Sequence, residues 1–129
     1  MVLDSSAILA ILLDEPERPS FTRLIEQDPM RLVSAATLVE VSIVIESRKG
    51  EAGRQLLERF LELTAAEVAS VTADQARHAC GAFRRWGKGR HPAGLDFGDV
   101  FAYALAEVTG EPLLFKGADF ARTDITSAA

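Results

Sequence analysis

The chain has 129 residues, of which 48% are hydrophobic and 26% charged, and its net charge is −5. This length suits one domain with its own core, which we expect over residues 1–129. No apolar run is long enough to span a membrane. The single cysteine, Cys80, cannot form an internal disulfide, so we expect a cytoplasmic protein. The acidic balance argues against a protein that attracts nucleic acid by its overall charge alone.

Short apolar runs alternate with helical patterns along the chain. The apolar runs predict buried strands at residues 1–4, 30–34, 68–71 and 112–115. Apolar periodicity and capping residues predict helices at residues 5–13, 16–29, 35–50, 51–67, 72–87 and 96–110, with Gly50 and Gly110 ending two of them and Thr72 capping a third. Strands that alternate with helices form right-handed βαβ units, so we expect an α/β fold, with a central parallel sheet of four to five strands and helices on both faces.

Acidic residues follow the predicted strands at the places where each strand ends. Asp4 closes the first strand, and Glu40 lies in the first turns of the helix after the second strand. Asp99 lies in the first turn of the last long helix, and Asp119 follows the last strand by four residues. Ligands of an open parallel sheet bind at the carboxyl ends of its strands. The topology therefore directs four carboxylates to one edge of the sheet.

Each of these carboxylates also has a purely structural interpretation. Acidic residues near helix N-termini cap free amides and stabilise the helix dipole, and Asp96 and Asp99 could form such a pair. The helices that carry Glu40 and Asp99 are, however, apolar almost all round, so we expect both to be buried. Buried carboxylates are costly unless they are paired or bind metal, and no matching lysines or arginines stand beside them in the sequence. A hard divalent cation, Mg²⁺ or Mn²⁺, would offset their repulsion.

A basic segment comes just before Asp99. No acidic residue occurs from Gln75 to Leu95, and the candidate phosphate contacts in this segment are Arg84, Arg85, Lys88 and Arg90. Basic side chains neutralise phosphates, although cations near a helix C-terminus can also be a solvated end that favours the dipole. Beside an acidic metal site, the basic segment indicates a track for a phosphodiester chain.

Four segments, taken together, resemble the motifs of PIN-domain ribonucleases, and most closely those of the VapC toxins of bacterial type II toxin–antitoxin pairs. The segments are "MVLDSSAIL", "ATLVEVSIVIE", "LDFGDVFAYALA" and "PLLFKGADF". They occur in order and extend over essentially the whole chain. The resemblance implies a PIN domain that acts as a Mg²⁺- or Mn²⁺-dependent endoribonuclease, forms a homodimer and is silenced by a VapB-type antitoxin.

The resemblance also implies roles for single residues. Asp4, Glu40 and Asp99 match the family's acidic positions, and Ser6 matches the hydroxyl residue that supports the first aspartate. The implied reaction is metal-assisted hydrolysis of RNA, in which Asp4 and Asp99 bind the principal ion. Glu40 and Asp119 then contribute directly or through water.

The fourth motif departs from the family pattern. It usually carries two aspartates two residues apart, but Gly117 occupies the first of these places and only Asp119 occupies the second. Asp124 is a weaker substitute for the missing aspartate. One metal suffices for the expected reaction, and a second metal stays open.

Two other classes of protein fit parts of the pattern. A receiver domain would use Asp4 as a phosphate acceptor and would need neither Glu40 nor the basic segment. A non-catalytic binding module would tolerate replacement of Asp4 and Asp99. The sequence also leaves open which RNA would be cut, because recognition of RNA depends on loop shape and base stacking.

Overall fold

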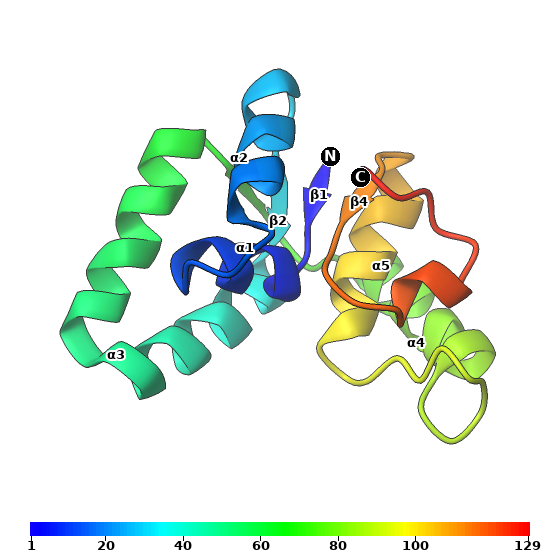
Figure 1. Cartoon of the computed structure of the whole chain (residues 1–129). Coiled ribbons are helices and arrows are strands. Elements are labelled where there is room, and N and C mark those ends of the chain that lie inside the picture. Colours follow the sequence, from blue (N-terminus) through cyan, green and yellow to red (C-terminus); the bar gives the residue numbers. More distant parts are fainter.

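The computed structural model describes every residue from Met1 to Ala129 and has the expected α/β architecture (Figure 1). The elements are, in chain order, β1 (Val2–Leu3), α1 (Ser5–Leu12), α2 (Arg18–Gln27), β2 (Leu32–Ser34), α3 (Ala35–Thr64), β3 (Glu67–Ala69), α4 (Ala73–Trp86), α5 (Asp99–Thr109), β4 (Leu113–Leu114) and the 3-10 helix η1 (Phe120–Arg122). None of the helices combines the length and the apolar character that a membrane span requires.

The four strands form one parallel sheet in the order β3-β2-β1-β4. Val2 of β1 pairs with Leu32 of β2 on one side and with Leu113 of β4 on the other. A further isolated bridge joins Ser127, near the C-terminus, to Leu113. The prediction of a central parallel sheet is therefore confirmed, and the carboxyl end of β1 lies between neighbours on the edge where helices α1 and α3 begin.

Helices cover both faces of the sheet, because successive strand residues point to opposite sides. Figure 1 shows α1, α2 and α3 on one side of the strands and α4 and α5 on the other. Leu3, Val33 and Leu114 belong to the core under the first group of helices. The residues beside them in the strands, Val2, Leu32 and Leu113, belong to the core under the second group.

The long helix α3 changes direction at Gly50, whose φ of +58° and ψ of −139° are not helical. Figure 1 shows the sharp bend between the two arms. A positive φ is readily adopted by glycine, which has no Cβ. The predicted end of a helix at Gly50 is thus confirmed, and the second arm of α3 begins directly after the bend.

Two expectations about the helices were wrong in detail. The helix predicted from Asp96 begins at Asp99, with Gly98 at its N-cap, and Asp96 lies before it and accepts a hydrogen bond from the N–H of Asp99. The helix that carries Glu40 is not buried all round: Val41 and Ile45 are buried, but Val39 is 58% exposed and Ile43 is 62% exposed. Only one side of this arm packs on the sheet, so its outer side stays open to solvent.

Candidate functional site

Asp4 lies where β1 ends and α1 begins, and it is buried, with only 2% of its surface exposed. Its Oδ2 accepts hydrogen bonds from the backbone N–H of Ser6 at 3.0 Å and from the Ser6 hydroxyl at 2.6 Å. Its Oδ1 is buried without any hydrogen-bond partner. Burial raises the pKa of Asp4 to about 6, the charge of Glu40 pushes the pKa the same way, and the bonds from Ser6 oppose the rise. One oxygen of Asp4 is thus fixed, while the other is left free for a ligand.

Glu40 reaches the site from the second turn of α3, a helix that Ser34 caps through its side chain. Its carboxylate rests directly on the backbone of Gly98: a Cβ at Gly98 would lie 2.0 Å from Glu40 Oε2. Gly98 immediately precedes α5, whose first residue is Asp99. The absent side chain at Gly98 therefore allows Glu40 to approach the start of the helix that carries Asp99.

Asp99 and Asp96 cap each other's backbone at the start of α5. Asp99 Oδ2 accepts from the N–H of Asp96 at 3.0 Å, and Asp96 Oδ1 accepts from the N–H of Asp99 at 2.9 Å. Burial raises the pKa of Asp99 to about 7, and the charges of Asp4 and Asp96 act in the same direction, while the N–H of Asp96 lowers it. The helix itself is buried as expected, through Val100 and the residues that follow. Asp99 is therefore both a helix cap and a member of the acidic site.

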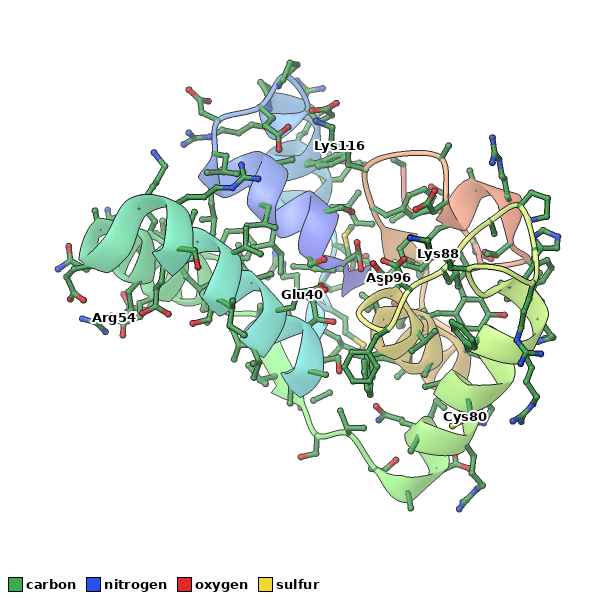
Figure 2. All side chains as sticks on the ribbon, turned by 90° about the horizontal axis from the view of Figure 1, so that it is seen from below. Glu40, Arg54, Cys80, Lys88, Asp96 and Lys116 are labelled. Carbon is green, nitrogen blue, oxygen red and sulfur yellow. The ribbon has the colours of Figure 1, made fainter.

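Asp96 adds a carboxylate that sequence reasoning interpreted only as a capping partner. Figure 2 looks onto the edge where the strands end, with Glu40 and Asp96 near its centre and Lys88 beside them. The D-x-x-D spacing at the helix start was the available signal, but it does not distinguish a cap from a site residue.

The donor set of this site suits a hard divalent cation. Its ligands would be carboxylate oxygens, which Mg²⁺ and Mn²⁺ prefer, and the buried, unpartnered Oδ1 of Asp4 is one such donor. In this conformation no three acidic, histidine or cysteine side chains stand close enough together to enclose an ion. Both carboxylates that would lead the coordination are engaged instead with the protein, Asp4 with Ser6 and Asp99 with Asp96.

The last two acidic candidates lie differently. Asp119 is exposed at the start of η1, and no hydrogen bond or ion pair joins its side chain to the other carboxylates. Asp124, the weaker substitute for the missing motif aspartate, is engaged by Tyr103 and Arg85 rather than by these carboxylates. Its Oδ1 accepts a 2.5 Å hydrogen bond from Tyr103, and Arg85 lies 3.9 Å from its Oδ2. Asp124 belongs to a network that fastens the C-terminal segment to α5.

The same network separates Arg85 from the other basic candidates. Arg85 pairs with Glu107 at 3.1 Å and donates to the Tyr103 hydroxyl at 3.2 Å. The ion pairs of the structure include none from Arg84, Lys88 or Arg90, all of which are exposed. The cation of Arg85 is thus neutralised within the fold, whereas the other three are available to a ligand.

The loop that carries Lys88 and Arg90 is closed at its base. Lys88 N–H donates to Leu95 O at 2.8 Å, and Leu95 N–H donates to Trp86 O at 3.0 Å. The guanidinium of Arg90 lies 5.8 Å from the centre of the Phe83 ring. This anchored loop leads along the chain into Asp96 and Asp99 and so connects the exposed cations to the acidic site.

Comparisons with known proteins place the chain in a family over almost its whole length. The chain matches the PIN domain family over residues 1–125. It is 49% identical over 129 residues to VapC ribonuclease Mb0640 of Mycobacterium bovis, covering 100% of this chain and 98% of that protein. It is 50% identical over 127 residues to ribonuclease VapC of Mycolicibacterium smegmatis, covering 98% of each chain.

Solved structures show the same fold at much lower sequence identity. VapC20 of Mycobacterium tuberculosis, a toxin that cleaves the sarcin-ricin loop, superposes with a TM-score of 0.78 at 20% identity, covering 97% of this chain and 95% of that one. VapBC2 of Rickettsia felis, solved on a DNA fragment of its promoter, gives a TM-score of 0.76 at 14% identity, covering 98% of this chain and 94% of that one. The full-length identity to the mycobacterial proteins, together with the match over residues 1–125, shows that this chain belongs to the VapC group of the PIN-domain family.

Proposed function

We propose that this chain is a divalent-metal-dependent endoribonuclease and the toxin of a type II toxin–antitoxin pair. Its full-length relatives are named VapC ribonucleases, which supports the reaction class. The observation that carries the proposal is Asp4, a carboxylate buried beside Glu40 and Asp99 with one oxygen left without a partner. A buried, unpaired carboxylate beside two others is costly to the fold unless a cation offsets the charge.

Asp4 and Asp99 are the residues that would hold Mg²⁺ or Mn²⁺. A bound ion would supply positive charge for the scissile phosphate and would acidify an attacking water. Ser6 keeps Oδ2 of Asp4 engaged, so Oδ1 is the oxygen offered to the ion. Glu40 is partly exposed and rests against Gly98, so it is placed to accept a proton from water at the mouth of the site. We assign Asp119 contact through water only, since no side-chain interaction ties it to the others.

The end of α4 and the loop after it would guide the RNA backbone to these carboxylates. Arg84, Lys88 and Arg90 are exposed, and the backbone of Lys88 is hydrogen-bonded to Leu95, the residue before Asp96. Each cation that contacts a phosphate releases counterions and adds salt-dependent affinity. Arg85 is left out of this role because Glu107 and Tyr103 already engage it.

We propose two protein partners, a VapB-type antitoxin and a second copy of the chain. The antitoxin follows from the VapC group, and one neighbour in fold is a toxin–antitoxin complex from Klebsiella pneumoniae. The second copy would cover the open side of α3 and the start of α5, where Val39, Ile43 and Phe97 are 58%, 62% and 79% exposed. A groove of about 270 Å³ lies among these residues. Apolar surface gathered in this way marks a site of protein association.

The test is cleavage of RNA by the purified chain with Mn²⁺ or Mg²⁺ and with EDTA. The proposal predicts cleavage only with the metal, and suppression of cleavage by the co-expressed antitoxin. A receiver domain would instead bind a phosphoryl mimic at Asp4 and leave RNA intact. If the RNA stayed intact with Mn²⁺, with Mg²⁺ and with EDTA, the proposed nuclease activity would be wrong.

A further inference from the structure

A serine hydroxyl takes the place of a strand carbonyl where β1 turns into α1. In the ladder between β1 and β4, Val2 N–H donates to Pro112 O at 2.8 Å and Asp4 N–H donates to Leu114 O at 3.0 Å. The next donor is the N–H of Lys116, but Asp4 O already accepts from the first turn of α1. Lys116 N–H donates instead to Ser6 Oγ at 2.9 Å.

This bond sets the direction of the proton on Ser6. A backbone N–H can only donate, so Ser6 Oγ is the acceptor toward Lys116. The single hydroxyl proton of Ser6 is then committed to Asp4 Oδ2, 2.6 Å away. Because Lys116 holds the hydroxyl in this orientation, Asp4 keeps one oxygen engaged and presents the other.

The side chain of Lys116 is held by two carboxylates. Its Nζ lies 2.5 Å from Glu15 Oε2 and 3.3 Å from Glu17 Oε2, both in the turn between α1 and α2. The next residue, Gly117, turns the backbone away with a φ of +101°. Figure 2 shows Lys116 on the α1 side of the edge, apart from Lys88 and Asp96. These two ion pairs, which we call the Lys116 clip, join the turn between α1 and α2 to the end of β4.

We infer that Lys116 is a positioning residue for Asp4, acting through the Ser6 hydroxyl and held in place by Glu15 and Glu17. The inference rests on the proposed function, in that it concerns how Asp4 is prepared for a divalent cation. A lysine that merely added positive charge near the site would weaken the attraction of a cation. Removing a positioning residue does the opposite, because Asp4 loses its fixed orientation.

The experiment is isothermal titration of Mn²⁺ into the metal-free chain without RNA. Lys116→Met should bind Mn²⁺ about ten-fold more weakly, at the low end of the range found for groups that orient metal ligands. Lys116→Arg should retain the affinity. Arg18→Met is the matched control: it removes a cation from the first residue of α2, next to the same turn, where Arg18 pairs with Asp14, and should leave the affinity unchanged.

A double-mutant cycle identifies the route. Ser6→Ala should weaken Mn²⁺ binding. Lys116→Met keeps the backbone N–H but releases its anchor, so it should cost little more in the Ser6→Ala background, where the hydroxyl that the N–H orients is gone. If Lys116→Met does not fold, Glu15→Gln with Glu17→Gln breaks the clip from its other side and should give the same pattern.

The outcomes separate the inference from the proposed function. Unchanged or tighter Mn²⁺ binding by a folded Lys116→Met, while the parent binds and Asp99→Asn does not, overturns the inference alone. Full additivity of the two variants also overturns it. Failure of the parent to bind Mn²⁺ overturns the metal site and the inference with it.

Discussion

The carboxylate of Glu40 occupies the space in which a side chain at Gly98 would stand. A Cβ there would lie 2.0 Å from Oε2 and 2.7 Å from Cδ of Glu40. The backbone of Gly98 is ordinary right-handed helix, with φ −67° and ψ −41°, so its conformation does not demand glycine. The close approach of Glu40 does.

Gly98→Ala should therefore displace Glu40 while preserving the fold. Glu40 ends a flexible side chain that can swing toward solvent, so the free energy of unfolding should change by less than about 1 kcal/mol. RNA cleavage should fall by roughly ten-fold or more, the loss typical of a disturbed metal environment. Cleavage rate and urea denaturation measure the two effects.

Gly81→Ala is the matched control for this variant. Gly81 lies within α4, and the nearest atom to an added Cβ is 3.9 Å away. Replacing a helical glycine by alanine should stabilise the fold by about 0.5–1 kcal/mol and leave cleavage unchanged. Equal activity of Gly98→Ala and the parent would show that Glu40 has no part in the reaction.

The metal-free chain should lose stability as the pH rises from 4 to 7. The pKa values of Asp4 and Asp99 are raised to about 6 and about 7, so the folded state binds more protons than the unfolded state in this range. Their stabilising contribution is complete below the unfolded value near 3.8 and is lost as the pH passes the folded values. For Asp4 the loss is about 2–3 kcal/mol.

Urea denaturation in EDTA at several pH values measures this slope. The carboxylates with lowered pKa values, such as Asp28 and Glu107, act with the opposite sign but only at lower pH. Asp4→Asn should flatten the curve, and Mn²⁺ should restore stability at pH 7. If the free energy of unfolding of the parent in EDTA stayed constant or rose from pH 4 to pH 7, the raised pKa values of Asp4 and Asp99 would be contradicted.

The exposed cations at the end of α4 and in the loop after it should carry the salt dependence of RNA binding. In an inactive background, replacing Arg84, Lys88 and Arg90 by alanine should reduce the log–log slope by about 2, because each phosphate contact on a single strand contributes about 0.7. Arg85→Ala should leave the slope unchanged, since Glu107 already neutralises that charge. Fluorescence anisotropy across salt concentrations measures the slope. Equal effects of Arg85→Ala and the triple variant would refute the distinction.

The open side of α3 should hold the second copy. Ile43→Glu places a charge at a residue that is 62% exposed, so it should convert a dimer to a monomer without unfolding the chain. Leu63→Glu, at a 73% exposed position beyond the bend of α3, should leave the dimer intact. Light scattering after size exclusion gives the mass. A dimeric Ile43→Glu would place the contact elsewhere.

The sequence predicts those parts of the fold that depend on local patterns. Apolar runs gave the parallel strands, and Gly50 and Thr72 gave a helix break and a cap where the structure has them. The exposure of Val39 and Ile43 was missed, because an apolar helix looks the same whether one side or both are covered. Only packing between distant elements decides that.

The candidate site was predictable to the extent that topology alone determines it. The strand ends bring Asp4 next to Glu40 and Asp99, as the alternation of strands and helices implied. The hydrogen bond from Tyr103 to Asp124 was not predictable, because it depends on the path of the C-terminal segment. The link from Lys116 to Ser6 joins residues 110 positions apart, and no local pattern in either segment shows that the two are bonded.

The central claim is that Asp99 binds a divalent cation that the reaction needs. Asparagine can still accept the hydrogen bond from Asp96, so Asp99→Asn removes charge while the cap at the start of α5 is kept. Without metal, the variant should be at least as stable as the parent at pH 7.5, because one of several crowded charges is gone. Binding of Mn²⁺ to the parent raises its melting temperature, and the variant should gain less.

The decisive measurement pairs melting temperature, with and without Mn²⁺, with cleavage of total RNA by the same preparations. The account predicts that Asp99→Asn folds, loses the Mn²⁺-dependent gain and leaves RNA intact. If the charge of Asp99 only stabilised the helix dipole, Asp99→Asn would lower the free energy of unfolding by about 0.3–1 kcal/mol and would keep its activity. An Asp99→Asn variant that cuts RNA at the parent's rate would contradict the claim.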